Sequence, residues 1–247
     1  MARRVVFSDG VVSSRLEALL ADLDVEVRSR DMTSCAALGN KSFGPPAVHA
    51  DNDALSLVVG RSRLHLDLDD VMRRMKGGRN QALARACDAG SGLRVLDACA
   101  GWGTDGLSLA GWGCRVTFVE AQPLVAMLLA DRVDRFQNAT VCEPLTTIHA
   151  DVRELLRDQT GQYDVIFIDP MFPAHPKTAK PALRMQVLGE LGLTAPPSEL
   201  LELALGRSRL RVVVKTRAKG APLSGVRPPA WQIRAKSVRF DVYRVDR

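Results

Sequence analysis

From residue 93 onward, short apolar runs alternate with helical patterns. Apolar runs that predict buried strands cover 93–97, 115–120, 146–150 and 163–169, and helical spacing falls between them. Two further apolar runs, 210–215 and 240–245, predict the last two strands. Strands that alternate with helices predict an α/β fold with a Rossmann-like, mostly parallel sheet. Because the stretch between the last two strands carries little helical signal, we expect the final strand to be antiparallel.

The amino-terminal part follows a different pattern, with short strands and one helix. Helical spacing covers 11–21, and the alternation typical of strands covers 25–27, 55–60 and 64–68. The segment Lys76–Asn80 contains two adjacent glycines and predicts a hinge. We therefore expect a small N-terminal α+β domain over residues 1–78 and a Rossmann-like domain over residues 79–247.

The composition excludes several classes of protein. The chain has 247 residues, of which 46% are hydrophobic and 25% are charged, the balance of a globular fold. No apolar run approaches the roughly 20 residues that span a bilayer. The five cysteines are scattered without a Cys-x-x-Cys pair and the four histidines are not clustered, so we expect neither a disulfide framework nor a metal site. The start of the chain does not resemble a signal peptide, and we expect a cytoplasmic protein without a membrane partner.

Positive charge is concentrated in the last third of the chain. Residues 173–247 contain 15 Lys and Arg against 5 Asp and Glu, whereas the rest contains 19 against 23. This asymmetry predicts that one face meets a polyanion such as a nucleic acid. Only 5% of the residues are aromatic, so an extended stacking surface for single strands is not expected.

A glycine-rich segment follows the first strand of the Rossmann-like part. Gly101, Gly103 and Gly106 fit the G-x-G-x-x-G pattern, which allows a tight turn and close approach of the backbone to a nucleotide-like ligand. Glu120 ends the next strand and is placed to accept hydrogen bonds from both hydroxyls of a ribose. Asp97 precedes the glycines, where a carboxylate suits the cationic amino-acid end of S-adenosyl-L-methionine. The pattern favours that cofactor, and an NAD-dependent oxidoreductase is the alternative.

The third strand of this part also ends in an acid. Asp151 is placed to accept a hydrogen bond from the exocyclic amine of an adenine ring, with Val152 offering its backbone N–H. A cap for the helix that follows is an equally good interpretation of Asp151, and one side chain can serve both roles.

The most specific motif is Asp169-Pro170-Met171-Phe172, at the carboxyl end of the fourth strand, where open α/β sheets bind ligands. It resembles the Asp/Asn-Pro-Pro-Tyr/Phe motif of methyltransferases that modify exocyclic amines of bases. The Asp169 carboxylate and the Pro170 carbonyl can accept the amine hydrogens and direct its lone pair toward the methyl carbon. Phe172 offers a face on which an unstacked base can lie. These three residues are the candidate catalytic residues.

Together these motifs resemble the ribosomal RNA small subunit methyltransferase J family over about residues 55–243. The resemblance rests on the glycine-rich segment, on Phe118–Pro123, on Ile148–Ala150, on Ile168–Pro173 and on the segments 76–79, 177–180, 212–215 and 239–243. It implies an S-adenosylmethionine-dependent enzyme that makes N2-methylguanosine in 16S rRNA, with that RNA or the small ribosomal subunit as partner. Carried over by motif position, the cofactor contacts fall on Thr104, Asp105, Glu120, Ala121, Asp151, Val152 and Asp169. The chain departs from the family's usual residues at Thr104, Ala121 and the pair Asp151-Val152.

A paired guanine must be extruded before its N2 amine can meet a cofactor, and phosphate contacts have to offset that cost. The predicted RNA-binding residues are cations near the motif and at the glycine hinge, namely Arg79, Lys177, Lys180, Arg184, Lys215 and Arg217. Two alternatives within the same chemistry stay open at this point, an amine methyltransferase for adenine N6 and one for protein glutamine. A non-catalytic RNA-binding protein of the same fold is a third.

Overall fold

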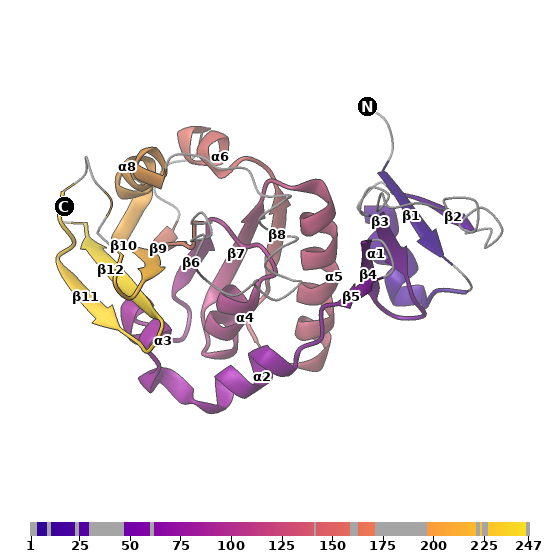
Figure 1. Ribbon diagram of the computed structural model, residues 1–247, viewed down its shortest axis with the longest axis horizontal. Coiled ribbons are helices and arrows are strands. Elements are labelled where there is room, and N and C mark those ends of the chain that lie inside the picture. Colours follow the sequence, from indigo (N-terminus) through magenta and orange to yellow (C-terminus); the bar gives the residue numbers. More distant parts are fainter. Residues whose placement is uncertain are drawn as a thin grey trace.

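The computed structural model describes residues 4–8, 11–22, 25–29, 47–59, 62–140, 142–158, 163–170, 197–220, 223 and 227–245. These residues form two β-sheets that lie on opposite sides of one long helix, α5 (Figure 1). The smaller sheet has the strand order β2-β1-β3-β4-β5, and the larger sheet has the order β11-β12-β10-β9-β6-β7-β8. Among the helices of these residues, none is long and apolar enough to cross a membrane.

The smaller sheet mixes parallel and antiparallel pairs. Strand β1 pairs in parallel with β2 and β3, and β3, β4 and β5 pair antiparallel. The expected helix and the strands at 25–27 and 55–60 are present, and the strand expected at 64–68 lies earlier, at Ser62–His65. Strands β1 and β3 were not predicted. The elements are β1 (Arg4–Ser8), α1 (Ser14–Asp22), β2 (Val25–Ser29), β3 (Ala47–Ala50), β4 (Leu55–Val59) and β5 (Ser62–His65).

The larger sheet confirms the predicted Rossmann-like fold. Strands β8, β7, β6, β9 and β10 are parallel, and β12 runs antiparallel to β10 as expected. Strand β11 was not predicted, because its four residues are mostly exposed and carry little apolar signal. The strands are β6 (Arg94–Asp97), β7 (Arg115–Glu120), β8 (Thr146–His149), β9 (Tyr163–Ile168), β10 (Ser208–Arg217), β11 (Trp231–Arg234) and β12 (Val238–Arg244). The helices are α2 (Asp69–Lys76), α3 (Ala82–Cys87), α4 (Thr104–Gly111), α5 (Pro123–Ala139), α6 (Val152–Asp158) and α8 (Pro197–Arg207).

Helices cover both faces of the larger sheet. Along the central strand β9, Val165 and Phe167 pack with α3 and α4, whereas Ile166 and Ile168 pack with α6 and α8. All four side chains are fully buried. Because neighbouring residues of a strand point to opposite faces, a strand covered on both sides has an uninterrupted apolar sequence, and this is why 163–169 was predictable.

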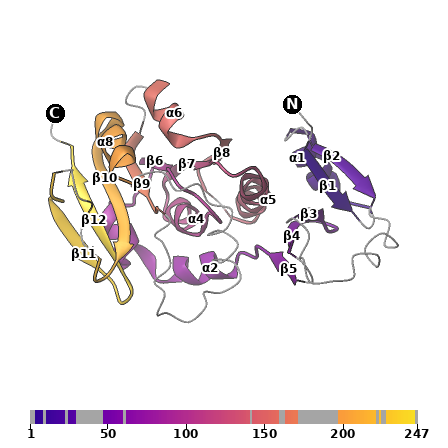
Figure 2. The same cartoon turned by 45° about the horizontal axis from the view of Figure 1, so that its top comes forward.

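The smaller sheet shares its core with α5. Val125, Met127 and Leu128 from α5 are buried in the same cluster as Leu55 and Leu57 from β4. Figure 2 shows the smaller sheet beside α5, with the chain passing from β5 into α2.

The expected domain boundary at residue 78 lies beyond α2, yet α2 packs on the larger unit. Leu66 still belongs to the core of the smaller sheet, whereas Leu68 and Val71 pack in the core of the larger one. We therefore propose that the smaller unit ends between Leu66 and Leu68, about ten residues before the two glycines of the expected hinge at Lys76–Asn80.

Candidate active site

Three predicted carboxylates lie in a row at one edge of the larger sheet. Asp169 follows β9, Asp97 ends β6 and Glu120 ends β7, and these three strands are neighbours. Strand β6 is also the point at which the strand order reverses, because the chain continues from β6 to β7 on one side and reaches β9 on the other. The carboxyl edge of a parallel sheet at such a switch point is where open α/β folds bind their ligands.

The glycine-rich loop joins β6 to α4 at this edge. Gly103 precedes α4 with φ of 76°, in the left-handed region that favours glycine. Gly106 serves a different purpose, since a Cβ atom there would lie 2.4 Å from the Phe118 ring and 2.6 Å from the Asp97 carboxylate. Helix α4 can approach the sheet this closely only because residue 106 has no side chain.

Glu120 ties the loop to β7. One carboxylate oxygen accepts a hydrogen bond from the Gly101 amide at 2.9 Å, and the other accepts one from the Gln122 amide at 2.8 Å. Burial raises the pKa of Glu120 above its ordinary value. A carboxylate oxygen can accept more than one hydrogen bond, so both oxygens can still receive ligand hydroxyls. The neighbouring Ala121 carbonyl lies 3.1 Å from the His149 ring nitrogen Nε2.

Asp97 is a buried acceptor that lacks a donor. Its side chain is 2% exposed, and its Oδ1 atom has no hydrogen-bond partner in the part of the chain that the structure describes. Burial, together with the nearby carboxylates Asp105 and Asp169, raises the pKa of Asp97 well above its ordinary value. An unpaired buried acceptor among like charges is costly unless a ligand supplies a donor. A ligand ammonium group would supply the missing donor. The buried Asp97 acceptor therefore fits the methionine end of S-adenosylmethionine, which carries such a group.

Asp169 belongs to a chain of charges that crosses the edge of the sheet. The Lys215 ammonium, from β10, lies 2.7 Å from Asp169 Oδ2 and 2.6 Å from Asp105 Oδ2. Asp105, in the first turn of α4, also pairs with Arg74 of α2. Lys215 therefore joins a predicted catalytic carboxylate to a predicted cofactor contact, and both were identified from motifs far apart in the sequence.

Burial and the ion pairs in this chain of charges shift the pKa values of Asp169, Asp105 and Lys215. Burial raises the pKa of Asp169 to about 6, although Lys215 opposes the shift. Burial would also raise the pKa of Asp105, but Lys215 and Arg74 outweigh burial and hold it below its ordinary value. Burial disfavours the charged form of Lys215, yet its two carboxylate partners raise its pKa overall. Near neutral pH both carboxylates are therefore ionised around one ammonium.

Replacing Lys215 with methionine is expected to shift the acid limb of the pH profile. Asp169 also faces the carboxylates Asp97 and Asp105 and the more distant Arg74, so loss of the ammonium leaves mainly negative neighbours and raises the pKa of Asp169 further. If the ionised carboxylate is the active form, the acid limb of kcat/KM moves to higher pH, and activity lost near neutrality returns in alkaline buffer. An acid limb at the wild-type position in K215M would contradict this role.

Asp151 acts as a helix cap. Its Oδ1 atom accepts a hydrogen bond from the Arg153 amide at 2.9 Å, at the start of α6, and its carboxylate forms an ion pair with the Arg153 guanidinium. The hydrogen bond from the Arg153 side chain lowers the pKa of Asp151. The structure thus confirms the cap interpretation, and Val152 is buried as the first residue of α6. Adenine binding at this position stays a prediction.

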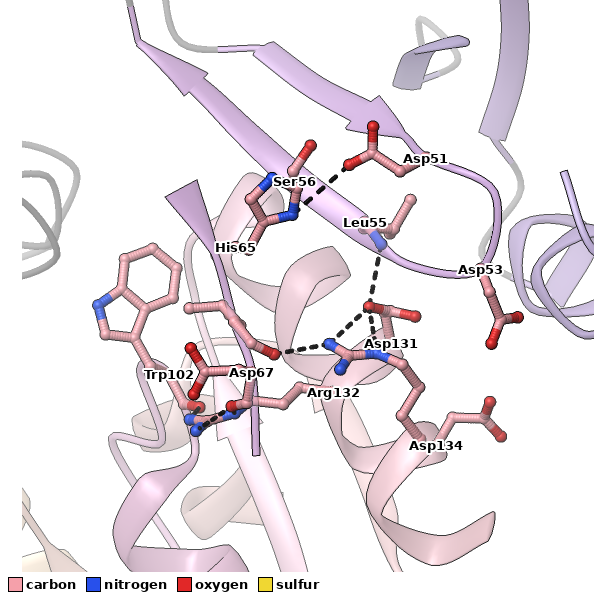
Figure 3. Close-up of polar contacts among 12 residues, drawn as sticks. Asp51, Asp53, Leu55, Ser56, His65, Asp67, Trp102, Asp131, Arg132 and Asp134 are labelled. Carbon is pink, nitrogen blue, oxygen red and sulfur yellow. Dashed lines mark hydrogen bonds and ion pairs between the residues drawn. The ribbon is translucent and has the colours of Figure 1, made fainter. Parts of the chain in front are cut away.

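Arg132 supports the glycine-rich loop from α5 and was not identified from the sequence. Its guanidinium is fully buried and donates hydrogen bonds to the Trp102 carbonyl at 2.6 Å and to the Asp67 carbonyl at 2.7 Å (Figure 3). A third hydrogen bond goes to Thr104 Oγ1 at 2.9 Å. Arg132 also pairs with the Asp70 carboxylate. Thr104, predicted as a cofactor contact, is therefore held in this network by Arg132 and by Asp70, whose carboxylate accepts its hydroxyl at 3.0 Å.

The predicted RNA-binding cations lie in different places. Lys215 is engaged in the charge chain, and Arg217 is exposed at the end of β10. Arg79 donates a hydrogen bond to the Trp112 carbonyl at 3.0 Å, just after the end of α4, so the structure does not bring it to Asp169. Pro170 is buried beside Asp169. Phe172, Lys177, Lys180 and Arg184 lie outside the described residues.

A metal-binding cluster is absent from the described part of the chain. No group of three or more His, Cys, Asp or Glu side chains there is arranged to hold a metal ion.

Comparisons with known proteins agree with this geometry. The family model "Putative SAM-dependent methyltransferase" matches residues 49–245. A ribosomal RNA small subunit methyltransferase J from Legionella pneumophila (strain Philadelphia 1) is 41% identical over 175 residues, which cover 69% of this chain and 71% of the relative. Another, from Alkalilimnicola ehrlichii, is 39% identical over 255 residues, with 98% and 95% covered. The crystal structure of a SAM-dependent methyltransferase from Neisseria gonorrhoeae is similar with a TM-score of 0.69, 25% identity, and 98% and 96% of the two chains covered.

Proposed function

Because the chain belongs to the ribosomal RNA small subunit methyltransferase J family, we propose that it uses S-adenosylmethionine to methylate the exocyclic N2 of a guanine in 16S rRNA. The observation that carries the proposal is the position of Asp169, which stands one strand away from the unpaired Asp97 acceptor at the switch point of the sheet. A base amine at Asp169 would thus lie beside the cofactor site. The substrate is 16S rRNA or the small ribosomal subunit, which places the reaction in the cytoplasm.

Different residues at the edge of the sheet would bind different parts of the cofactor. Asp97 would pair with the ammonium of the methionine end, and Glu120 would accept the ribose hydroxyls that its two oxygens can still receive. Asp151 and the Val152 amide would meet the adenine ring. When bound, S-adenosylmethionine supplies a methyl group on a positively charged sulfur.

Asp169 and Pro170 position the amine that receives the methyl group. An exocyclic amine conjugated with its ring is a poor nucleophile, and acceptors for its hydrogens turn its lone pair toward the methyl carbon. The amine loses its proton only after the new C–N bond begins to form, so Asp169 accepts a hydrogen bond first and a proton late. Phe172 would hold the extruded base by stacking. Most of the rate then comes from orientation, which is worth several kcal/mol in reactions of this kind.

The proposal is tested on the rRNA of cells that lack this protein. Mass spectrometry of 16S rRNA nucleosides is expected to show the loss of one N2-methylguanosine, which returns when the wild-type gene is supplied but not when Asp169→Ala is supplied. Undiminished N2-methylguanosine would overturn the proposal. Loss of an N6-methyladenosine or of a methylated protein glutamine instead would assign the same site to a different amine.

A further inference from the structure

Four exposed cations gather where β10, β11 and β12 meet at the carboxyl edge of the larger sheet. Arg217 ends β10, Lys219 follows it, Arg234 ends β11, and Lys236 lies in the turn that leads into β12. We call these four residues the basic rim. Strand pairing puts Arg217 opposite the first residue of β12, which brings the β11–β12 turn to the end of β10. A hydrogen bond from the Ala218 amide to the Ser237 carbonyl joins the two segments.

The basic rim lies at the same edge of the sheet as the candidate active site. Lys215, two residues before Arg217, contacts Asp169 through its ammonium. Arg234 is opposite Arg239 of β12, which is in turn opposite Thr216 of β10. Adjacent strands are about 4.8 Å apart, so Arg234 stands about 10 Å from the strand that carries Lys215. Strand β9, which precedes Asp169, is one strand further, about 14 Å from Arg234, and nucleotides that flank a base held at Asp169 could reach that far.

Three of the four rim cations carry charge that no acid of the neighbouring described segments neutralises. Residues 208–220 and 227–245 contain ten Lys and Arg but a single acid, Asp241, which is buried in an ion pair with Arg239. In the described part of the chain, no carboxylate pairs with Lys219, Arg234 or Lys236. By contrast Lys215, further inside, is shared by two carboxylates. Lys219, Arg234 and Lys236 therefore remain available to an external anion.

We propose that the basic rim binds phosphates of the RNA strand on one side of the target nucleotide. This inference rests on the proposed function, because it takes the nucleic acid to be the substrate. Extruding a base costs roughly a few kcal/mol, and contacts to the flanking backbone both offset that cost and set the register of the strand. The basic rim can supply such contacts without entering the site, because its cations lie at the ends of β10 and β11, which are one and three strands away from β9 and Asp169.

The test compares two triple variants with the same change in net charge. The rim variant is K219Q/R234Q/K236Q, and the control is R94Q/R209Q/R244Q, whose residues lie on β6, β10 and β12 at the opposite, amino-end edge of the sheet. The rim variant is expected to flatten the plot of log affinity for a 16S rRNA fragment against log salt by about 2 to 3 units, because each phosphate contact contributes about 0.7 to 0.9. Each single rim variant should account for about one unit or slightly less.

Kinetics separate the basic rim from the catalytic residues. In the rim variant the KM for RNA is expected to rise at least tenfold, while kcat at saturating RNA and the affinity for S-adenosylhomocysteine stay at wild-type values. A wild-type salt slope and KM in the rim variant would overturn the inference, and so would an equal loss in the control. If wild-type protein methylates no RNA at all, the proposed function fails instead, and the two failures are thus distinguishable.

Discussion

Replacing Asp169 with alanine is expected to lower turnover of the RNA by at least a hundredfold while S-adenosylhomocysteine binds with nearly unchanged affinity. Asp169 is placed to hold the amine, whereas Asp97, Glu120 and the glycine-rich loop are placed to hold the cofactor. An interaction made mainly in the transition state lowers kcat and kcat/KM together when it is removed. Single-turnover methylation measures the loss of turnover, and calorimetric titration measures the affinity for S-adenosylhomocysteine.

Asp164→Asn is the matched control for Asp169. Asp164 lies near the start of the same strand, where it accepts a hydrogen bond from the Arg94 amide at 3.0 Å, at the edge of the sheet opposite the site. Its replacement should leave turnover within a few-fold of wild type. Turnover near the wild-type rate in Asp169→Ala would refute the assignment of this carboxylate.

Replacing Asp131 with alanine is expected to destabilise the whole protein. Asp131 is fully buried on α5 and accepts a hydrogen bond from the Leu55 amide at 3.0 Å (Figure 3). It also accepts hydrogen bonds from the Arg15 and Arg135 guanidinium groups, each at 3.0 Å. Removing one partner from a buried charge network costs about 3 to 5 kcal/mol, because the other charges and the Leu55 amide lose their acceptor. For a chain of this length that corresponds to a fall in Tm of about 6 to 20 °C, measured by circular dichroism.

Asp134→Ala provides the comparison for Asp131. Asp134 lies one turn further along α5 and pairs with the same Arg15 at 2.6 Å, but its side chain is 37% exposed. An exposed ion pair contributes about 1 kcal/mol or less, so the Tm should change by a few degrees at most. Equal destabilisation by the two variants would show that burial does not determine the strength of this contact between the smaller sheet and α5.

The parallel topology made most of the site predictable. Once apolar runs identified β6, β7 and β9, the acids at their ends had to meet at one edge, and the structure places Asp97, Glu120 and Asp169 there. Local patterns also predicted the cap at Asp151, because an aspartate just before a helix often accepts hydrogen bonds from the first backbone N–H groups of that helix.

Contacts between distant segments were not predictable from local patterns. Helical periodicity places Asp131 and Arg132 in a helix but treats charged residues as exposed, whereas both are fully buried because Leu55 and Asp67 lie against α5. Lys215 was assigned to RNA because it lies in the basic third of the chain, and nothing in its neighbourhood signals the Asp105 carboxylate on α4. Residue spacing alone does not show which segments pack together.

The hydrogen bond between the Leu55 amide and the Asp131 carboxylate constrains the order in which the chain can fold during its synthesis. Leu55 leaves the ribosome 76 residues ahead of the carboxylate that its amide will meet, and the apolar partners Val125, Met127 and Leu128 emerge equally late. At 5 to 20 residues per second that interval lasts about 4 to 15 s. During this interval β4 lacks both the Asp131 carboxylate that accepts its Leu55 amide and the apolar side chains of α5 that complete its core. The strands that are made first therefore complete their packing only after the glycine-rich loop and α5 have been translated.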